Sequence, residues 1–535
     1  MDRHSFLPGH LPFNPSELPV MSKSKTAATV TVNTASSSSD RVCDSPASEQ
    51  PQVAPKPRVP RINYDPVAKF SNFITEWTPF LLVWTYLAFS ICLYMLFPGT
   101  LFPIFWFIYL LTNFYIAGNA VMEAILSISA IRESRKTQDK LAAKDWKFPT
   151  PDDDLLFLDI VIVAYLPNEK DIIVDRATYA AEKIMYPHHK LRVNIVYNTP
   201  KPMLELETRL WALEAKYPHL RIHKVPGSTS KADNLNYFLT LPKSSDVISI
   251  FDCDHYPHPY GPRHAVERMI GHPTVDIVQG RCVVFNSDES FMSAMVAVEF
   301  DKIYAVSHPG RAAMWNFGLF CGSNGYWRAD LIRELKMHGH MLTEDIDSAL
   351  RAFGRGCEVV HDLNCVSYEL APTTFPVLWK QRLRWAQGWA QASWVHAPKI
   401  WQKTPPGQPK RTGVQRFGLF SLLAVRESSY YLVSQYTCFV FSIICLDFPK
   451  SGFELFRLVF FPFPLSLWFF VISVSCLLGT LLITNYAKCE FVRRHHIIVF
   501  SILYPAYLIL NSIMGLYGHA RQLIRYTKWN PTVRK

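Results

Sequence analysis

The sequence predicts an α/β domain, doubly wound around a largely parallel sheet, between two groups of transmembrane helices. Three short apolar runs, 159–164, 191–197 and 246–251, alternate with stretches of helical character, which is typical of buried parallel strands. Apolar segments of membrane length lie on both sides, within 79–120 and 417–518. We therefore expect a folded domain at 148–401, with interfacial helices at its end, and a membrane part on each flank.

The first 61 residues differ from the rest in composition. They are rich in Ser, Thr and Pro, include a run of four serines at 36–39 and show no apolar periodicity. Such a segment cannot bury enough apolar surface to fold, so residues 1–61 are predicted to be a disordered tail. No basic stretch precedes an apolar core and a cleavage site, so no signal peptide is predicted.

Two membrane spans are predicted before the α/β domain. Segments 79–97 and 101–120 are each near the ~20 residues that cross a bilayer as a helix, and a Pro-Gly-Thr junction at 98–100 suits a tight hairpin. A cluster of Lys and Arg follows between 132 and 147. Positive charge beside a span marks the cytosolic side, so the domain at 148–401 is expected in the cytosol.

The C-terminal apolar zone contains a conflict. Spans are predicted at 428–446, 465–486 and 497–518, but the loop at 488–496 and the tail at 519–535 are both basic. Both basic stretches favour the cytosol, and a single crossing would separate them. One span must therefore be wrong: the last is re-entrant, or it contains two short crossings. The number of C-terminal spans, three or four, is therefore undecided.

The overall charge agrees with a membrane protein. The chain has 535 residues, 49% of them apolar, and a formal net charge of +11. Nucleic acid is the usual partner of a basic protein, but here the basic residues flank apolar spans and anionic lipid is the better partner. The eleven cysteines include no Cys-x-x-Cys pair, which argues against a disulfide framework or a structural zinc site.

Asp252 and Asp254 follow directly after the third apolar run. Ligands of doubly wound sheets bind at the carboxyl ends of the strands. Two carboxylates one residue apart can share a hard cation, Mg²⁺ or Mn²⁺, which would neutralise a departing diphosphate. An ordinary surface turn is the alternative for Asp-x-Asp alone.

A second acidic group stands at 343–347. Thr343 is placed to cap a helix whose first turn holds Glu344, Asp345 and Asp347, and this alone would explain the acids. The functional interpretation makes Asp345 a general base that takes a proton from an acceptor hydroxyl. Asp347 is the rival carboxylate, and spacing does not choose between them.

Gln381, Arg384 and Trp385 fall at positions i, i+3 and i+4, so on a helix they share one face. Arg384 offers a fork of donors to a diphosphate, and Trp385 offers a flat face to a sugar ring. The alternative is an amphipathic helix lying on the membrane, with interfacial anchors at Lys380, Arg382, Trp389 and Trp394. Both interpretations are compatible.

Two further segments carry candidate residues. Lys231 and Asn236, in the stretch 230–238, are placed to contact nucleotide phosphates, although an ordinary helix start is the alternative. Gly322 and Asn324 belong to a Gly-interrupted turn at 320–328, predicted to lie on the acceptor side. Cys321 is interpreted as a packing residue, because no His-Asp pair is placed to activate it.

As an ordered set these motifs resemble the membrane-embedded polysaccharide synthases of glycosyltransferase family 2: the cellulose, chitin and hyaluronan synthases, and the type 2 glycosyltransferases of filamentous fungi. The resemblance covers about 157–391 and adds matches at 164–169 and at Glu369 with Pro372. It implies a cytosolic GT-A domain that inverts the anomeric centre. It also implies donor binding by Asp252, Asp254, Lys231, Asn236, Glu169 and Arg384, the base Asp345, and acceptor binding by Gln381, Trp385, Gly322 and Asn324.

The resemblance has one weak echo and one departure. Trp529 and Arg534, in the basic tail 519–535, resemble the segment that covers the occupied UDP site in hyaluronan and chitin synthases, which implies a gating role. The acidic residue that contacts uracil in many members is missing, since 197–200 reads Tyr-Asn-Thr-Pro. Nucleotide recognition is therefore expected to differ.

The expected function is a processive inverting transferase that polymerises a UDP-sugar, UDP-glucose or UDP-N-acetylglucosamine, into a cell-surface or cell-wall polysaccharide and extrudes it. The partners are then the donor, the growing polysaccharide and membrane lipid, with no nucleic acid, in an integral multi-pass protein of the plasma membrane. Two alternatives remain: a non-processive lipid glycosyltransferase of the ceramide glucosyltransferase kind, and a catalytically silent scaffold with the same fold.

Overall fold

The computed structural model describes residues 66–243, 245–404, 410–461 and 464–526. The predicted disordered tail and the gating residues Trp529 and Arg534 lie outside these residues, so the predictions for them stay predictions. Residues from Thr75 onward belong to one compact unit, and every contact below lies within it. Residues 66–74 belong to a second unit and form the first turns of α1 (Pro66–Leu96).

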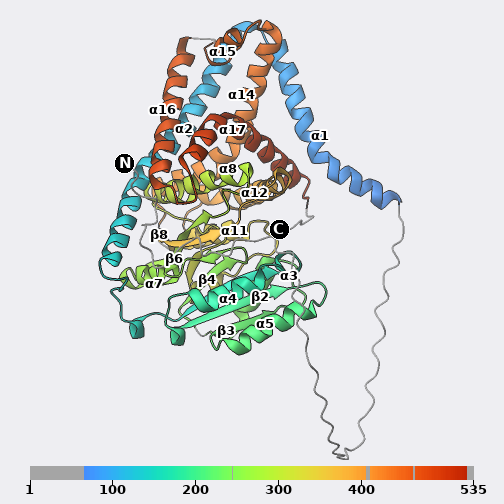
Figure 1. Ribbon diagram of the computed structural model, residues 1–535. Helices are drawn as coiled ribbons and strands as arrows, with labels where there is room; N and C mark the ends of the chain where they lie inside the picture. The colour runs from blue at the N-terminus through green and yellow to red at the C-terminus, as the bar shows by residue number, and fades with distance from the viewer. Residues whose placement is uncertain (1–65, 244, 405–409, 462–463, 527–535) are drawn as a thin grey trace, which may run out of the picture. The chain divides into compact units, whose positions relative to one another are not determined.

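The centre of the soluble domain is an eight-stranded sheet in the order β3-β2-β1-β4-β7-β6-β8-β5 (Figure 1). Its first four strands are parallel: β3 (Leu220–Lys224), β2 (Leu191–Asn198), β1 (Leu158–Tyr165) and β4 (Val247–Asp252). The three predicted strands are thus confirmed within one residue at each end. Each is an almost fully buried apolar run, and for this reason its composition predicted a strand.

The second half of the sheet is mixed. The short strand β7 (Gly325–Arg328) runs antiparallel between β4 and β6 (Val275–Val284), and β6 is parallel to β8 (Glu358–Glu369). The two-residue β5 (Tyr256–Pro257) pairs antiparallel with the end of β8. A four-residue strand carries little periodicity, so the sequence pattern could not show this reversal.

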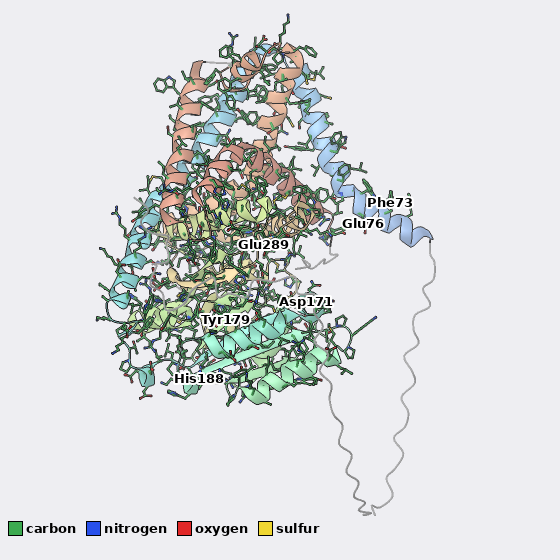
Figure 2. All side chains as sticks on the ribbon, viewed as in Figure 1. Phe73, Glu76, Asp171, Tyr179, His188 and Glu289 are labelled. Atoms are coloured by element: carbon green, nitrogen blue, oxygen red, sulfur yellow. The ribbon has the colours of Figure 1, made fainter. Side chains whose placement is uncertain are left out.

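Helices cover both faces of the sheet, and a separate apolar core fills each side. One side holds α4 (Ile173–Lys183), α5 (Leu204–Lys216) and α7 (Gly261–Gly271); the other holds α6 (Lys231–Thr240), α10 (Ala329–Leu335) and α11 (Glu344–Arg355). Tyr179 on α4 is buried against the sheet, and its hydroxyl donates to the Pro257 carbonyl at 2.9 Å (Figure 2). The two layers fix the positions of the strand ends.

Within the described part of the chain, five helical segments are long and apolar enough to cross a membrane. They comprise α1, α2 (Phe102–Ala142), the run from α13 (Gly413–Phe420) through η7 (Ser421–Val425) to α14 (Arg426–Asp447), α16 (Pro464–Ala487) and α17 (Arg494–Leu523). The short α15 (Gly452–Phe460) joins α14 to α16. The spans expected from the sequence fall almost entirely within these segments, but α2 continues well beyond residue 120.

Aromatic and polar contacts hold the bundle together. Phe439 on α14 is fully buried among rings of α1 and α2, including Tyr94 and Tyr109, whose hydroxyls hydrogen-bond each other. The Tyr94 hydroxyl also donates to Gln435 at 2.7 Å, and Gln435 donates to the Ser90 hydroxyl at 2.8 Å. Interhelical hydrogen bonds of this kind replace the hydrophobic drive that lipid removes.

A layer of helices joins the sheet to the bundle. It comprises α8 (Phe291–Phe300), the π-helix η5 (Asp301–Ser307), α9 (His308–Trp315) and α12 (Phe375–His396). The Arg281 guanidinium on β6 bonds Asp301 at 2.5 Å, and both side chains are 1% exposed. Arg281 also donates to the Ala487 carbonyl at the end of α16, at 2.9 Å. The sheet and the candidate membrane helices are therefore one packed structure.

Candidate active site

A cavity of about 690 Å³ begins at the carboxyl ends of β1, β2 and β4 and continues to α2, α14 and α17. The cavity has two regions, which we call the sheet end and the membrane end. The sheet end is the region around Asn198, Lys231, Asp252, Asp254 and Asp345. The membrane end is lined by Tyr115, Glu123, Glu299, Lys302, Arg311, Arg382, Tyr430, Tyr504 and Asn511. Its start at the strand ends agrees with the rule for open α/β sheets.

Asp252 and Asp254 lie where β4 ends, and both line the cavity. Their carboxylate oxygens and a ring nitrogen of His255 lie within 4.8 Å of one another. His255 is held from both sides, since its Nδ1 is 3.0 Å from the Ser367 hydroxyl and its Nε2 is 2.9 Å from Glu369. The two aspartates are therefore the better cation ligands, and a pair of carboxylates suits Mg²⁺ or Mn²⁺.

Lys231, at the first position of α6, spans the sheet end. Its Nζ is 2.6 Å from Asp252 Oδ1 and donates to the Gly322 carbonyl at 2.7 Å. Burial opposes a charged ammonium here, but Asp252 and Glu344 outweigh it and raise the pKa of Lys231. The side chain is therefore a permanent cation on the cavity wall.

Asp345 lies in the first turn of α11 and faces the loop that precedes β7. Gly322 in that loop has a φ of +91°, and a Cβ built on it would lie 2.6 Å from Asp345 Oδ2. Only glycine fits both the left-handed backbone and the close carboxylate. Burial raises the pKa of Asp345, against the lowering effect of Lys231. The sequence placed both residues in the site, and the structure brings them into contact.

Glu344 adds a second buried carboxyl at the same place. It lines the cavity beside Asp345, and burial raises its pKa to about 7, opposed by Lys231. Two neighbouring carboxyls titrate as a pair rather than as independent groups. Glu344 can therefore hold or release a proton near neutral pH beside Asp345, the candidate general base.

Asp347 has a different role from its neighbour. It is 1% exposed and bonds Arg351 at 2.8 Å and His396 at 2.8 Å, with His338 at 2.9 Å. Burial opposes its charge, but the hydrogen bonds from His396 and Arg351 outweigh burial and lower the pKa of Asp347 to about 2. It does not line the cavity. The structure thus separates the two rival carboxylates: Asp345 faces the cavity and Asp347 ties α11 to α12.

The capping prediction for Thr343 is wrong in its detail. Helix α11 does begin at Glu344, but the Thr343 side chain makes no capping hydrogen bond. Its hydroxyl is buried without a partner among the described residues, and it lines the cavity. Thr343 packs against Gly388 of α12, where a Cβ would lie 2.4 Å from its methyl carbon.

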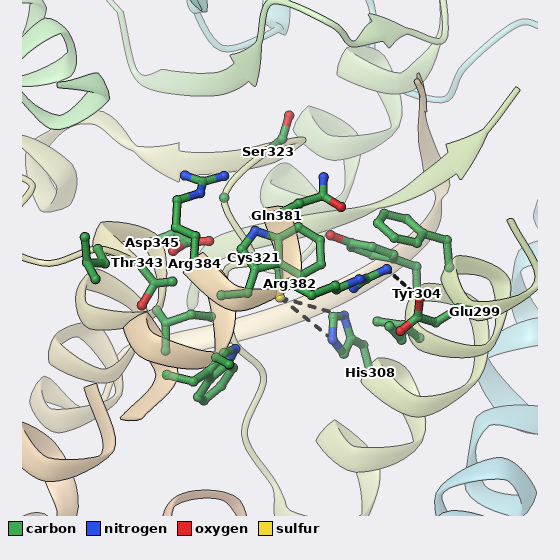
Figure 3. Close-up of a pocket in the computed structure, with 18 of the residues that line it drawn as sticks. Glu299, Tyr304, His308, Cys321, Ser323, Thr343, Asp345, Gln381, Arg382 and Arg384 are labelled. Carbon is green, nitrogen blue, oxygen red and sulfur yellow. Dashed lines mark hydrogen bonds and ion pairs between the residues drawn. The ribbon is translucent and has the colours of Figure 1, made fainter. Parts of the chain in front are cut away.

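Gln381, Arg384 and Trp385 all line the cavity from one face of α12, as their spacing predicts. Figure 3 shows Gln381, Arg384 and Asp345 among the side chains that line the cavity. Arg382 departs from its predicted place as an interfacial anchor. It is buried, bonds Glu299 at 2.5 Å, and its guanidinium lies 4.5 Å from the Trp385 ring centre. A buried carboxylate on α8 draws it inward.

Paired charges line the membrane end. Besides Arg382 with Glu299, Arg311 on α9 bonds Glu123 on α2 at 3.0 Å. Lys302 in η5 donates to the Tyr504 hydroxyl on α17 at 3.2 Å. Sequence reasoning missed this region. The signal that could have shown it is the charge of Glu299 and Lys302 inside an otherwise apolar stretch, which commonly marks function.

Two predicted ligands lie outside the cavity. The Asn236 amide bonds the Met337 backbone on both sides, donating to its carbonyl at 2.8 Å and accepting from its nitrogen at 2.9 Å. The Asn324 amide donates to the carbonyls of Arg281 and Cys365 and is fully buried. Neither residue lines the cavity. In the structure these amides satisfy backbone groups between elements, and it does not bring them together with the other predicted ligands.

Two other asparagines line the sheet end of the cavity. Asn198, at the end of β2, accepts at 2.9 Å from Asn234 on α6, and both line the cavity. Asn198 also donates to the Ser228 carbonyl at 3.0 Å. Asn198 stands where the sequence lacks the expected carboxylate. Asn236 follows Asn234 by two residues on α6, but only Asn234 lines the cavity.

Glu169 and Cys321 line the cavity as well. A Glu169 oxygen accepts from the Tyr165 nitrogen at 2.7 Å, which holds the loop after β1. Cys321 Sγ lies 3.7 Å from His308 Nδ1 (Figure 3). Burial raises the pKa of the thiol and lowers that of His308. Both groups stay neutral, which agrees with a packing role for Cys321.

Fold and site together define a glycosyltransferase with a GT-A domain built into a multi-pass membrane protein. A family model described as "Glycosyl transferase family group 2" matches residues 247–513, from the strand of the acidic pair through α17. The chain belongs to this glycosyltransferase family, as its motifs indicated.

Plant enzymes are among the relatives with curated descriptions. The probable glucomannan 4-beta-mannosyltransferase 7 of Oryza sativa subsp. japonica is 30% identical over 223 residues, 39% of this chain and 37% of its own. Glucomannan 4-beta-mannosyltransferase 2 of Arabidopsis thaliana is 28% identical over 260 residues, 46% and 48% respectively. The chain thus spans about half or less of these relatives. Their names give no support to glucose or N-acetylglucosamine as the donor sugar.

One solved structure is a mannosyltransferase from Pyrobaculum calidifontis in complex with GDP-Man and Mn²⁺. It aligns with 69% of this chain and 99% of its own, at 17% identity and a TM-score of 0.43.

Proposed function

We propose that this chain extends a cell-wall or cell-surface polysaccharide by transferring a hexose from a nucleoside-diphosphate sugar, with inversion, and passes the product along its membrane end. The observation that carries the proposal is the single cavity that joins the strand-end carboxylates to α2, α14 and α17. A donor at the sheet end and an acceptor at the membrane end would meet at Asp345.

The two ends of the cavity suit these two ligands. At the sheet end, the carboxylates of Asp252, Asp254, Glu344 and Asp345 outnumber the cations Lys231 and Arg384. An anionic diphosphate is repelled there unless a divalent cation binds with it, which is the role a metal between Asp252 and Asp254 fits. At the membrane end two arginines are paired with carboxylates, Lys302 contacts the Tyr504 hydroxyl, and aromatic rings suit an uncharged sugar chain.

The protein's residues have separable parts in the transfer. Asp345 accepts the proton of the acceptor hydroxyl as that oxygen bonds to the anomeric carbon, while the bond from this carbon to the diphosphate breaks. Lys231 and Arg384 bind the diphosphate oxygens, and Trp385 stacks on the acceptor sugar. When bound, Mg²⁺ or Mn²⁺ neutralises the leaving diphosphate. One displacement on the face opposite the leaving group inverts the centre.

The donor is proposed to carry mannose, with glucose as the second sugar to test. The names of the plant relatives motivate mannose. The pair Asn198 and Asn234 supports a nucleotide-binding mode other than the acidic contact to uracil, because two amides donate as well as accept. The base of the nucleotide is therefore part of the test.

The chain is further proposed to lie in the plasma membrane with its GT-A domain in the cytosol. Six basic residues after the first pair of spans support that orientation. Trp529 and Arg534 are proposed to cover the occupied donor site.

The test uses purified protein in nanodiscs with Mg²⁺ or Mn²⁺ and a panel of UDP- and GDP-linked glucose, mannose and N-acetylglucosamine. Nucleotide release and the size of the labelled product are followed, with Asp345→Asn as the control. The expected result is release with one sugar, a high-molecular-weight product, and a loss of ~10²–10⁴-fold in the control.

Other outcomes would contradict the proposal in distinct ways. A product of one sugar on a lipid that organic solvent extracts would favour a lipid glycosyltransferase. No release with any donor, from protein that unfolds cooperatively on heating, would favour a silent scaffold.

A further inference from the structure

The last described helix, α17, starts from a turn that is fixed to the catalytic domain. Ser287, after β6, donates to the Phe491 carbonyl at 2.6 Å. Asp301 in η5 accepts from the Cys489 nitrogen at 2.8 Å. These contacts, with that of Arg281 to the end of α16, hold residues 487–491 against the sheet side of the molecule.

The other end of α17 is fixed to the same side. Gln387 on α12 donates to the Tyr526 carbonyl at 2.7 Å. Gly518 lies so close to α12 that a Cβ would be 2.8 Å from the Gln387 nitrogen. His519 is 2.7 Å from Glu427, in the first turn of α14. That turn is the end of α14 nearest α12 and the cavity.

The middle of α17 stays at the same level. Lys302 reaches Tyr504, and the rings of Trp379 on α12 and Tyr517 lie 6.3 Å apart. Helices α12, α14 and α8 all pack along α17. Figure 1 shows α17 beside α8 and α12, between the sheet and the bundle.

From these contacts we infer that α17 lies along the membrane face of the catalytic domain and does not cross the bilayer. Its 30 residues would make a helix of about 45 Å, long enough for the ~30 Å apolar core, so composition alone cannot exclude a crossing. A crossing helix, however, has its ends on opposite sides. With α1, α2, α14 and α16 as the crossings, the C-terminal end returns to the side of the GT-A domain.

This arrangement removes the charge conflict in the sequence. Arg493 precedes α17 and Arg494 begins it, while Arg521 lies in its last turn and Arg525 follows it. With α17 lying flat, both basic groups face the same compartment as the GT-A domain, as positive loops favour.

The two faces of α17 differ accordingly. Tyr504, Leu508, Asn511 and Met514 line the cavity at the spacing of one helix face. On the opposite face Ile498, Ile502 and Ile509 are 60%, 73% and 38% exposed, as suits contact with lipid. If the proposed function holds, Tyr504 and Asn511 contact hydroxyls of the acceptor chain, and α17 is the wall that keeps lipid out.

Protease protection in sealed microsomes tests the orientation. One epitope is appended after Lys535, and a matched epitope is inserted between Phe448 and Ser451, in the turn after α14. We expect added protease to remove the C-terminal epitope together with the GT-A domain and to spare the epitope at 448–451. A C-terminal epitope protected like that at 448–451 would overturn the inference.

A pair of variants tests the wall. Asn511→Ala, on the cavity face, is expected to shorten the polymer while the donor KM stays unchanged; Ile509→Ala, on the lipid face, is expected to behave as wild type. Equal effects of the two variants on product length would contradict the assignment of faces. Absence of nucleotide release by the unmodified chain would overturn the proposed function, and the epitopes would then decide the inference by themselves.

Discussion

The sheet end and the membrane end of the cavity differ in how their charged side chains are paired. The sheet end gathers carboxylates from β4 and α11 around one lysine and one arginine, so it remains short of positive charge. The membrane end brings the same residue types together in pairs, Arg311 with Glu123 and Arg382 with Glu299. Under the proposed function, the open carboxylates suit a cation that binds with an anionic donor, and the paired arginines suit an uncharged acceptor chain.

The largest effect on the rate at the sheet end is expected from a change of backbone geometry at Gly322. Gly322→Ala forces a Cβ onto Asp345, and displacement of a reacting group by about 1 Å can cost ~10²-fold in rate. Gly227→Ala is the matched control: its φ is +70°, but nothing lies within 4 Å of the new Cβ. Both variants bear a backbone strain of about 1–2 kcal/mol, which thermal unfolding measures. If Gly322→Ala and Gly227→Ala released nucleotide at equal rates, the contact of residue 322 with Asp345 would have no part in catalysis.

Removing one open carboxylate should change the metal requirement. Asp254→Asn is expected to raise the Mn²⁺ concentration for half-maximal nucleotide release by on the order of 10–100-fold, the range seen when support of a metal ligand is lost. Chelation by EDTA should stop release by the wild type, and added Mn²⁺ should restore it. An unchanged metal titration would remove Asp254 from the cation site.

The pH profile examines the carboxyl pair. Because Asp345 must be unprotonated to accept a proton, release should fall as the pH drops through the raised pKa values of the pair, that of Glu344 being about 7. Glu344→Gln removes one negative neighbour, so the acid limb of kcat/KM should move to lower pH, with a change of less than about 10-fold at neutral pH. A limb that stays in place would show that Glu344 does not influence the base.

At the membrane end the same kind of change should affect stability instead. Glu299→Gln leaves Arg382 buried without its carboxylate, which typically costs about 3–5 kcal/mol. We expect a lower unfolding temperature in detergent and an unaltered Mn²⁺ titration. If Glu299→Gln shifted the metal requirement as Asp254→Asn does, the contrast between the two ends would collapse.

The sequence predicted the sheet end better than the membrane end for a physical reason. Apolar strands and the carboxylates that follow them are adjacent in the chain, so Asp252, Asp254 and the face of Gln381, Arg384 and Trp385 could be found from local pattern. Asn234 and Asn236 share one helix turn, and only tertiary packing decides which faces the cavity. The membrane end joins α2, α9 and α17, whose pairing no local pattern contains.

The position of α17 also bears on how the protein is made. The residues that close the membrane end, 504–514, are translated after every strand and every other described helix. A ribosome-bound chain can therefore complete its sheet and its acidic pair while the cavity still lacks a side. If α17 is the wall of the cavity, the cavity is completed only when this helix docks.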